Sequence, residues 1–181
     1  REGCVLCAFT CRYSGDVCDF FLFYTLINGW LHQNKAHCPV SGQQTAVRHQ
    51  LAIFFHDVVY QPRSSSNEQD SALWMRQQLA GALPETQLDK IVKWILATQQ
   101  HAVASESDLA YLLDIDLAIL GSSPQRFAEY QQQIRQEYVW VDELMYQEKR
   151  HAVLRQFYLM QPLYQTRYVQ QHYEQQAKTN L

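Results

Sequence analysis

Glycine, proline and long apolar runs are scarce in this 181-residue chain. After residue 45 only Gly81 and Gly121 remain, and the whole chain has five prolines. Because glycine and proline interrupt helices, their scarcity allows long helices over most of the sequence. The longest apolar candidate, residues 20–31, contains Asn28 and Gly29 and is shorter than the roughly 18 residues expected of a spanning helix. We therefore expect no membrane-spanning helix.

An excess of charge of one sign is also absent. The formal net charge is −3, with 47% hydrophobic and 18% charged residues, a composition typical of globular proteins. This charge gives no electrostatic reason to expect a nucleic-acid partner. The N-terminus lacks a basic region followed by an apolar run and a small-residue cleavage site, so we expect a cytoplasmic protein.

Cysteine is missing from most of the chain, because all five cysteines lie in the first 38 residues. An odd count without an export signal argues against a disulfide framework. The spacing Cys4-x-x-Cys7, followed by Cys11 and Cys18, suggests a zinc-binding module as one alternative, although it matches no standard pair of ligand knuckles. We treat residues 1–45 as an atypical Cys-rich segment and residues 46–181 as the helical domain.

The helical domain is predicted to hold about seven helices and little or no sheet, which is an all-α fold. Residues 45–59 are expected to form a buried helix, although a strand is not excluded by their period. A capping box at Ser65-x-x-Glu68 predicts a helix that runs to Ala80, with Gly81 at its C-terminal cap. Later helices are predicted to start at Pro84, Ser105 and Ser123. A further helix is predicted to end near Pro162, and a last polar helix follows it to the end of the chain. The helix after Pro84 has an inner stripe of Ile91, Trp94, Ile95 and Thr98.

His56 and Asp57 are adjacent ionisable residues at the end of a strongly apolar segment. An unpaired carboxylate buried there would cost several kcal/mol, so it needs a partner such as a metal ion. Neighbouring helical residues point about 100° apart, so the pair can hold one ion between them while other helices supply further ligands. A His–Asp hydrogen bond inside the core is the alternative interpretation.

Asp116 is predicted to be a second buried acid. It falls on the helical stripe formed by Leu109, Leu112, Leu113 and Leu120, whereas Asp114 lies about 200° round the helix. Periodicity therefore selects Asp116 to face a metal site. An arginine or tyrosine partner for a buried carboxylate is the other interpretation.

Three further residues are candidates for chemistry. Glu68 could act as a general base or orient a water molecule, or only cap a helix. His101 lies on the face of Trp94 and Thr98 and could be a ligand, a phosphate contact or a buried hydrogen-bonded histidine. Arg63 could meet a phosphate, or be a solvated loop residue.

Three segments together resemble the predicted metal-dependent phosphohydrolases of the HD superfamily. They are FFHDVVYQPRSSSNEQDSA (54–72), ILATQQH (95–101) and DIDLAILG (114–121). Short motifs in the tail, from residue 134 onward, also occur in the order and spacing typical of a bacterial subfamily of this superfamily. The likeness covers residue 46 to the end. It implies an HD-type helical bundle whose metal ligands are a histidine, the pair His56-Asp57 and the distant acid Asp116.

The resemblance implies cleavage of a phosphorylated small molecule, with nucleotides as the favoured class, by attack of a metal-bound water. The cofactor would be a divalent cation: Mn, Co, Ni, Mg, Fe or Zn. The alternative is a non-catalytic module that binds a nucleotide in a degenerate pocket. A homo-oligomer is also possible if Trp140, Tyr158 and Tyr168 expose aromatic surface.

The early part of the chain departs from the family pattern. The family carries its first histidine in a motif like Tyr-His-x-Leu-x-x-His-Ile, but residues 24–31 here read YTLINGWL. A frameshifted, misassigned or degenerate start would explain both this change and the Cys-rich segment. His32, His37 and His49 are possible substitute ligands, although none fits the motif.

Overall fold

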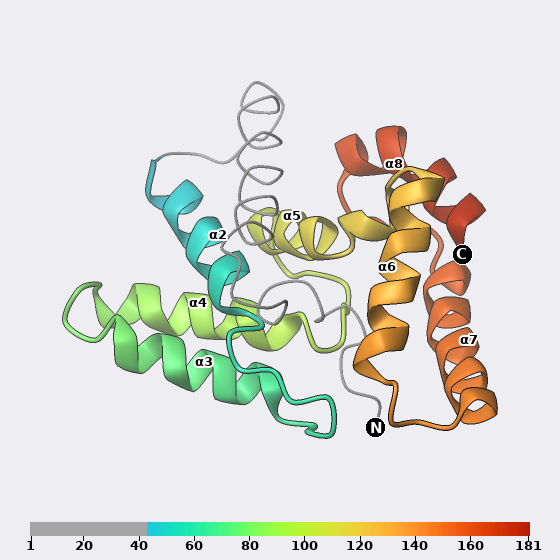
Figure 1. The fold of residues 1–181 in the computed structure, drawn as a ribbon. Coiled ribbons are helices and arrows are strands. Elements are labelled where there is room, and N and C mark those ends of the chain that lie inside the picture. The colour runs from blue at the N-terminus through green and yellow to red at the C-terminus, as the bar shows by residue number, and fades with distance from the viewer. Residues whose placement is uncertain (1–42) are drawn as a thin grey trace. The chain divides into compact units, whose positions relative to one another are not determined.

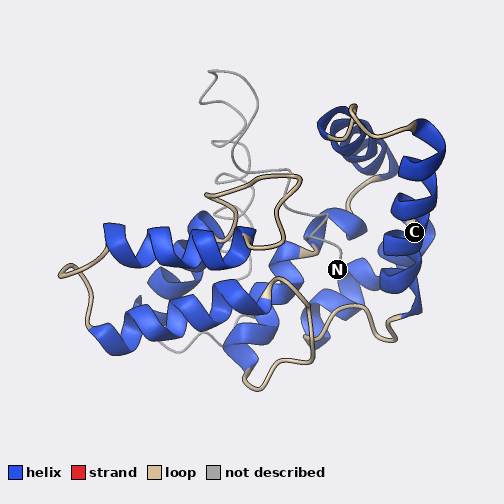
Figure 2. Ribbon diagram, turned by 90° about the horizontal axis from the view of Figure 1, so that it is seen from below, coloured by secondary structure: helices blue, strands red, loops and turns tan. Residues whose placement is uncertain are grey.

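The computed structural model describes residues 43–181, and this part of the chain is helical (Figure 1). The elements are α2 (Gln43–Phe55), α3 (Asn67–Gln78), α4 (Glu85–Ala97), α5 (Ser107–Asp116), the 3-10 helix η2 (Ala118–Gly121), α6 (Pro124–Glu137), α7 (Glu143–Leu159) and α8 (Arg167–Asn180). Within residues 43–181 the only β-type pairing is an isolated bridge between Ala80 and Leu83, and Figure 2 shows helices joined by loops. The prediction of an all-α fold with about seven helices is confirmed.

The chain divides into two compact units, with the boundary between Ala102 and Val103. Helices α2, α3 and α4 belong to the first unit, and the elements from α5 to α8 belong to the second. In the part of the chain that the structure covers, no helix has both the length and the apolar character needed to cross a membrane.

Helix α4 supplies the centre of the first unit. Its predicted inner stripe is confirmed, because Ile91, Trp94, Ile95 and Thr98 are all buried. Helices α2 and α3 both pack against α4 and contribute the buried side chains Ala52, Ile53, Phe55, Ala72 and Met75. Apolar burial of this extent is the main force that stabilises a three-helix unit.

The structure corrects several predicted helix ends. Helix α2 ends at Phe55 rather than residue 59. The predicted capping box is wrong: the N-cap residue of α3 is Ser66, its side chain makes no capping hydrogen bond, and its hydroxyl donates to Asp70 instead. Gly81 adopts φ +78° in the turn before α4, two residues beyond the C-cap Leu79. Because Ser66 is the N-cap residue of α3, Ser65 and Glu68 do not occupy the N-cap and N3 positions that a capping box requires.

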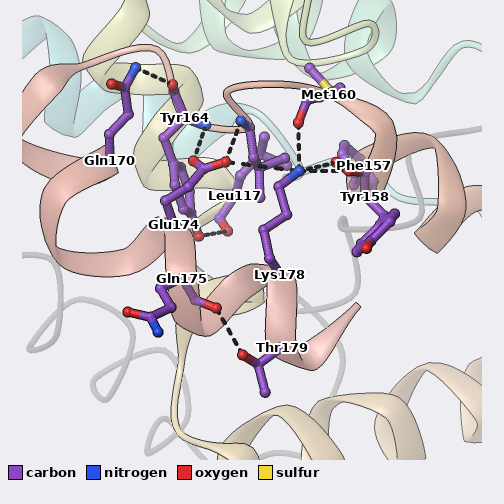
Figure 3. A network of polar contacts seen from close by, with 11 residues as sticks. Leu117, Phe157, Tyr158, Met160, Tyr164, Gln170, Glu174, Gln175, Lys178 and Thr179 are labelled. Carbon is purple, nitrogen blue, oxygen red and sulfur yellow. Dashed lines mark hydrogen bonds and ion pairs between the residues drawn. The ribbon is translucent and has the colours of Figure 1, made fainter.

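In the second unit, side chains of α8 form hydrogen bonds with the end of α7 and with the segment that follows it (Figure 3). The Lys178 ammonium donates to the carbonyl oxygens of Phe157, Tyr158 and Met160. A lysine at this position is favourable, because the last carbonyl groups of a helix are not followed by a further helical turn. One turn earlier, the Glu174 carboxylate accepts from the backbone N–H groups of Leu163 and Tyr164.

Gly121 is the position at which α8 packs against η2. A Cβ atom at this residue would lie 2.8 Å from the Tyr164 hydroxyl oxygen and 2.9 Å from the Tyr173 Cβ. Because backbone and core atoms, rather than a flexible chain end, would meet the added methyl group, only glycine fits this contact.

Helices α6 and α7 contact each other through two reciprocal arginine–tyrosine pairs. The Arg135 guanidinium of α6 lies 4.7 Å from the Tyr146 ring centroid, and the Arg150 guanidinium of α7 lies 5.1 Å from that of Tyr130. Much of α7 stays exposed, as do the nearby aromatic side chains Trp140 (49%) and Tyr158 (48%), while Tyr168 is half-buried. Self-association through this surface stays a prediction.

Candidate metal site

His56 continues the last turn of α2 and is almost fully buried. Its backbone N–H donates to Ala52 at 2.9 Å, and its ring atom Nδ1 lies 2.7 Å from the carbonyl oxygen of Ile53. A carbonyl oxygen only accepts, so Nδ1 carries the proton of this bond. Histidines that bind metals through Nε2 commonly donate Nδ1–H to a backbone carbonyl in this way, because the bond fixes tautomer and ring orientation.

The second ring nitrogen of His56 faces Asp57. The distance from Nε2 to the Asp57 Oδ2 atom is 3.0 Å. The other carboxylate oxygen, Oδ1, is buried and has no hydrogen-bond partner within the part of the chain that the structure describes. An unsatisfied buried acceptor costs about 1–3 kcal/mol, and more if charged. Two lone-pair atoms at 3.0 Å require a proton or a cation between them, so this pair is either an internal ion pair or part of a metal site.

Glu68, in the first turn of α3, is only 1% exposed. Its Oε2 atom accepts a hydrogen bond from the Gln99 side-chain amide at 3.1 Å. Burial raises the pKa of Glu68 above its usual range, and the negative charge of Asp57 acts in the same direction. Glu68 is therefore electrostatically coupled to the His56–Asp57 pair, as a general base beside that pair would be.

The raised pKa of Glu68 predicts how stability depends on pH. Because the pKa is higher in the folded chain than in the unfolded one, the stability contributed by this carboxyl is present below the ordinary value and lost as pH rises through the raised value. Glu68→Gln should therefore raise the urea midpoint of the metal-free protein at about pH 8, with a smaller gain near about pH 4, where glutamate is largely protonated. Urea unfolding with a chelator present measures both, and an equal gain at the two pH values would contradict the assignment.

Two polar side chains that sequence reasoning missed hold the loop after Asp57. The Asn67 amide accepts from the backbone N–H of Gln61 and donates to its carbonyl oxygen. The Ser71 hydroxyl makes the same pair of contacts with Val59. Both side chains are buried, and together they fix the path from the His56–Asp57 pair to Glu68. The sequence could have indicated Asn67 and Ser71 by their position on the buried side of the predicted helix.

His101 is buried and has an unusual backbone. Its φ is +49°, in the left-handed region that non-glycine residues seldom adopt, and its backbone N–H donates to Ala97. Such a conformation costs on the order of 1 kcal/mol and is concentrated at functional sites. His101 follows α4 by four residues, and its catalytic or ligand role stays a prediction. Arg63 is exposed in its loop, as expected of a solvated residue.

The expectation that Asp116 is the buried acid of its helix is not what the structure shows. Asp114 is 1% exposed and Asp116 is half-buried. Asp114 accepts three hydrogen bonds, from the backbone N–H of Gln165 at 2.7 Å and from the N–H and hydroxyl of Thr166 at 2.8 and 2.6 Å. Hydrogen-bond donors far along the chain thus make burial of Asp114 possible, although helical periodicity had placed this residue away from the apolar stripe. Asp116 belongs to the second unit, and its role as a metal ligand stays a prediction.

Of the three candidate substitutes for the first histidine ligand, only His49 lies among the described residues. His49 is buried on α2, with its ring 4.7 Å from that of Trp94, so it contributes to the core. It precedes His56 by two helical turns, about 10 Å along the axis. His32, His37, Tyr24 and the cysteine cluster lie outside the described residues. Among residues 43–181, no three His, Cys, Asp or Glu side chains are grouped so as to hold a metal ion.

The donor set of the pair nevertheless fits a divalent cation. An imidazole Nε2 fixed by a carbonyl and a carboxylate with an unsatisfied buried oxygen are both suitable ligands, although further ligands would have to join them. No protein-family model, curated protein or solved structure significantly matches the chain.

Proposed function

We propose that this protein is a metal-dependent phosphohydrolase of the HD type, acting on a phosphorylated small molecule of the nucleotide class. The observation that carries the proposal is the buried His56–Asp57 pair, in which one carboxylate oxygen has no hydrogen-bond partner among residues 43–181. The resemblance of residues 54–72, 95–101 and 114–121 to the HD superfamily supports the same chemistry. The substrate class rests on that resemblance alone.

In this proposal His56 Nε2 and Asp57 hold the cation, and Asp116 is a further ligand predicted from the sequence. A divalent cation at this place would act as a Lewis acid on a phosphoryl oxygen and would make water a stronger nucleophile at neutral pH. Glu68 would accept a proton from the attacking water, because its raised pKa brings it nearer to the working pH of a general base.

The test uses the full chain, stripped with a chelator and reloaded with manganese, cobalt or nickel. A panel of nucleotides and a generic phosphate ester is then assayed for released phosphate. The proposal predicts turnover that needs the metal and is removed by the chelator. A folded protein that binds metal but turns over none of these substrates would contradict the hydrolase assignment.

A second candidate is a binding module that holds a nucleotide without hydrolysing it. It is favoured by the absence of a three-ligand group among residues 43–181 and by the altered histidine motif at residues 24–31. Calorimetry with the same nucleotides separates the two functions. Saturable nucleotide binding without phosphate release, with or without metal, would support the module.

A further inference from the structure

The Gln99 side chain joins the turn after α4 to the start of α3. Its Nε2 donates to the Glu68 Oε2 atom at 3.1 Å and to the Ser65 carbonyl oxygen at 3.3 Å. Its Oε1 accepts from the Gln69 side-chain amide at 3.3 Å. Both ends of the Gln99 amide are therefore occupied, and all three partners lie within residues 65–69.

These contacts orient the amide as well as holding it. The Ser65 carbonyl and the Glu68 carboxylate both require a donor, so the NH₂ group must face them, while the Gln69 donor requires the oxygen on the other side. A hydrogen bond to a buried carboxylate is among the stronger ones, because one partner is charged. Gln99, which follows the end of α4, thus fixes the position of one carboxylate oxygen of Glu68 on α3.

We propose that Gln99 is a positioning residue whose amide fixes the orientation of the Glu68 carboxylate. The inference rests on the proposed function, since Glu68 is the group that it would serve. Gln99 itself contacts neither His56 nor Asp57 in any hydrogen bond or ion pair among the described residues. Its effect on a reaction would pass through Glu68.

The test compares Gln99→Met with Gln100→Met in the metal-loaded full chain. Methionine keeps the length of glutamine and removes both polar atoms, and the neighbouring Gln100 is exposed, so it provides a matched control. General-base groups contribute roughly 100-fold or more, so misplacing one should lower kcat by about tenfold or more while KM stays within about twofold. Gln100→Met should leave both constants near wild type.

A double-mutant cycle with Glu68→Gln tests whether Gln99 affects kcat through Glu68. If Gln99 acts through Glu68, Gln99→Met should lower kcat little further when Glu68 is already replaced. Manganese affinity, measured by calorimetry, should stay within about threefold in Gln99→Met, well below the 10- to 100-fold loss typical of an altered metal environment.

The possible failures are distinguishable. An active wild type whose kcat is unchanged by Gln99→Met overturns the positioning role and leaves the proposed function standing. A tenfold loss of kcat that persists undiminished in the Glu68→Gln background also overturns it. A wild type that neither binds manganese nor releases phosphate overturns the proposed function, and the role of Gln99 with it.

Discussion

Asp57→Asn is expected to lower the affinity for manganese by at least about 100-fold, since changes to groups that only support a ligand already cost about 10- to 100-fold. The substitution keeps the size and shape of the side chain. It removes the negative charge and replaces one of the two carboxylate oxygens with an NH₂ group, which cannot bind a cation. Metal-dependent release of phosphate should be lost with the metal.

The same substitution should not unfold the protein. Among the described residues, the buried Asp57 Oδ1 atom has no hydrogen-bond partner, so losing the charge removes an unfavourable group from the metal-free fold. Calorimetric titration with manganese measures the affinity, and urea unfolding with a chelator measures the stability. Asp70→Asn, at an exposed acid of α3, is the control and should bind as wild type does. Equal manganese affinity in Asp57→Asn and wild type would remove Asp57 from the site.

Asp114→Ala is expected to destabilise the protein by about 3 kcal/mol or more, because it leaves three buried or half-buried donors without their acceptor. The donors come from Gln165 and Thr166, and the bonds tie α5 to the segment before α8. Urea unfolding of metal-free protein gives the change in free energy directly.

Asp116→Ala is the matched comparison two residues away. Asp116 is half-buried whereas Asp114 is buried, so removal of the Asp116 carboxylate should cost clearly less stability than removal of the Asp114 carboxylate. If Asp116 is a metal ligand, the same variant should lose manganese affinity while staying folded. Comparable destabilisation by the two alanine variants would contradict the structural role assigned to Asp114.

Local sequence patterns predicted the helices well, because helix periodicity and helix starts are short-range properties. The stripe of α4 was confirmed residue by residue. The predicted helix start at Ser123 was confirmed too, since α6 begins at Pro124 and the Ser123 side chain caps it by accepting from the backbone N–H of Arg126. Patterns of this kind depend on neighbours within about one helical turn.

The same local patterns did not predict contacts between residues that are far apart in the sequence. Asp114 is buried by donors 51 and 52 residues away, and Gln99 reaches Glu68 across 31 residues. Helical periodicity carries no information about such partners, so it assigned Asp114 to the outside and overlooked Gln99. The burial of His56 and Asp57 was predictable, because an apolar segment precedes them directly.

A crystal of the full chain soaked in manganese and measured at the manganese absorption edge tests the metal site most directly. The site predicts an anomalous peak within about 2.0–2.3 Å of His56 Nε2 and of an Asp57 carboxylate oxygen. A well-ordered His56–Asp57 pair without such a peak, with a proton joining Nε2 to Oδ2, would contradict it.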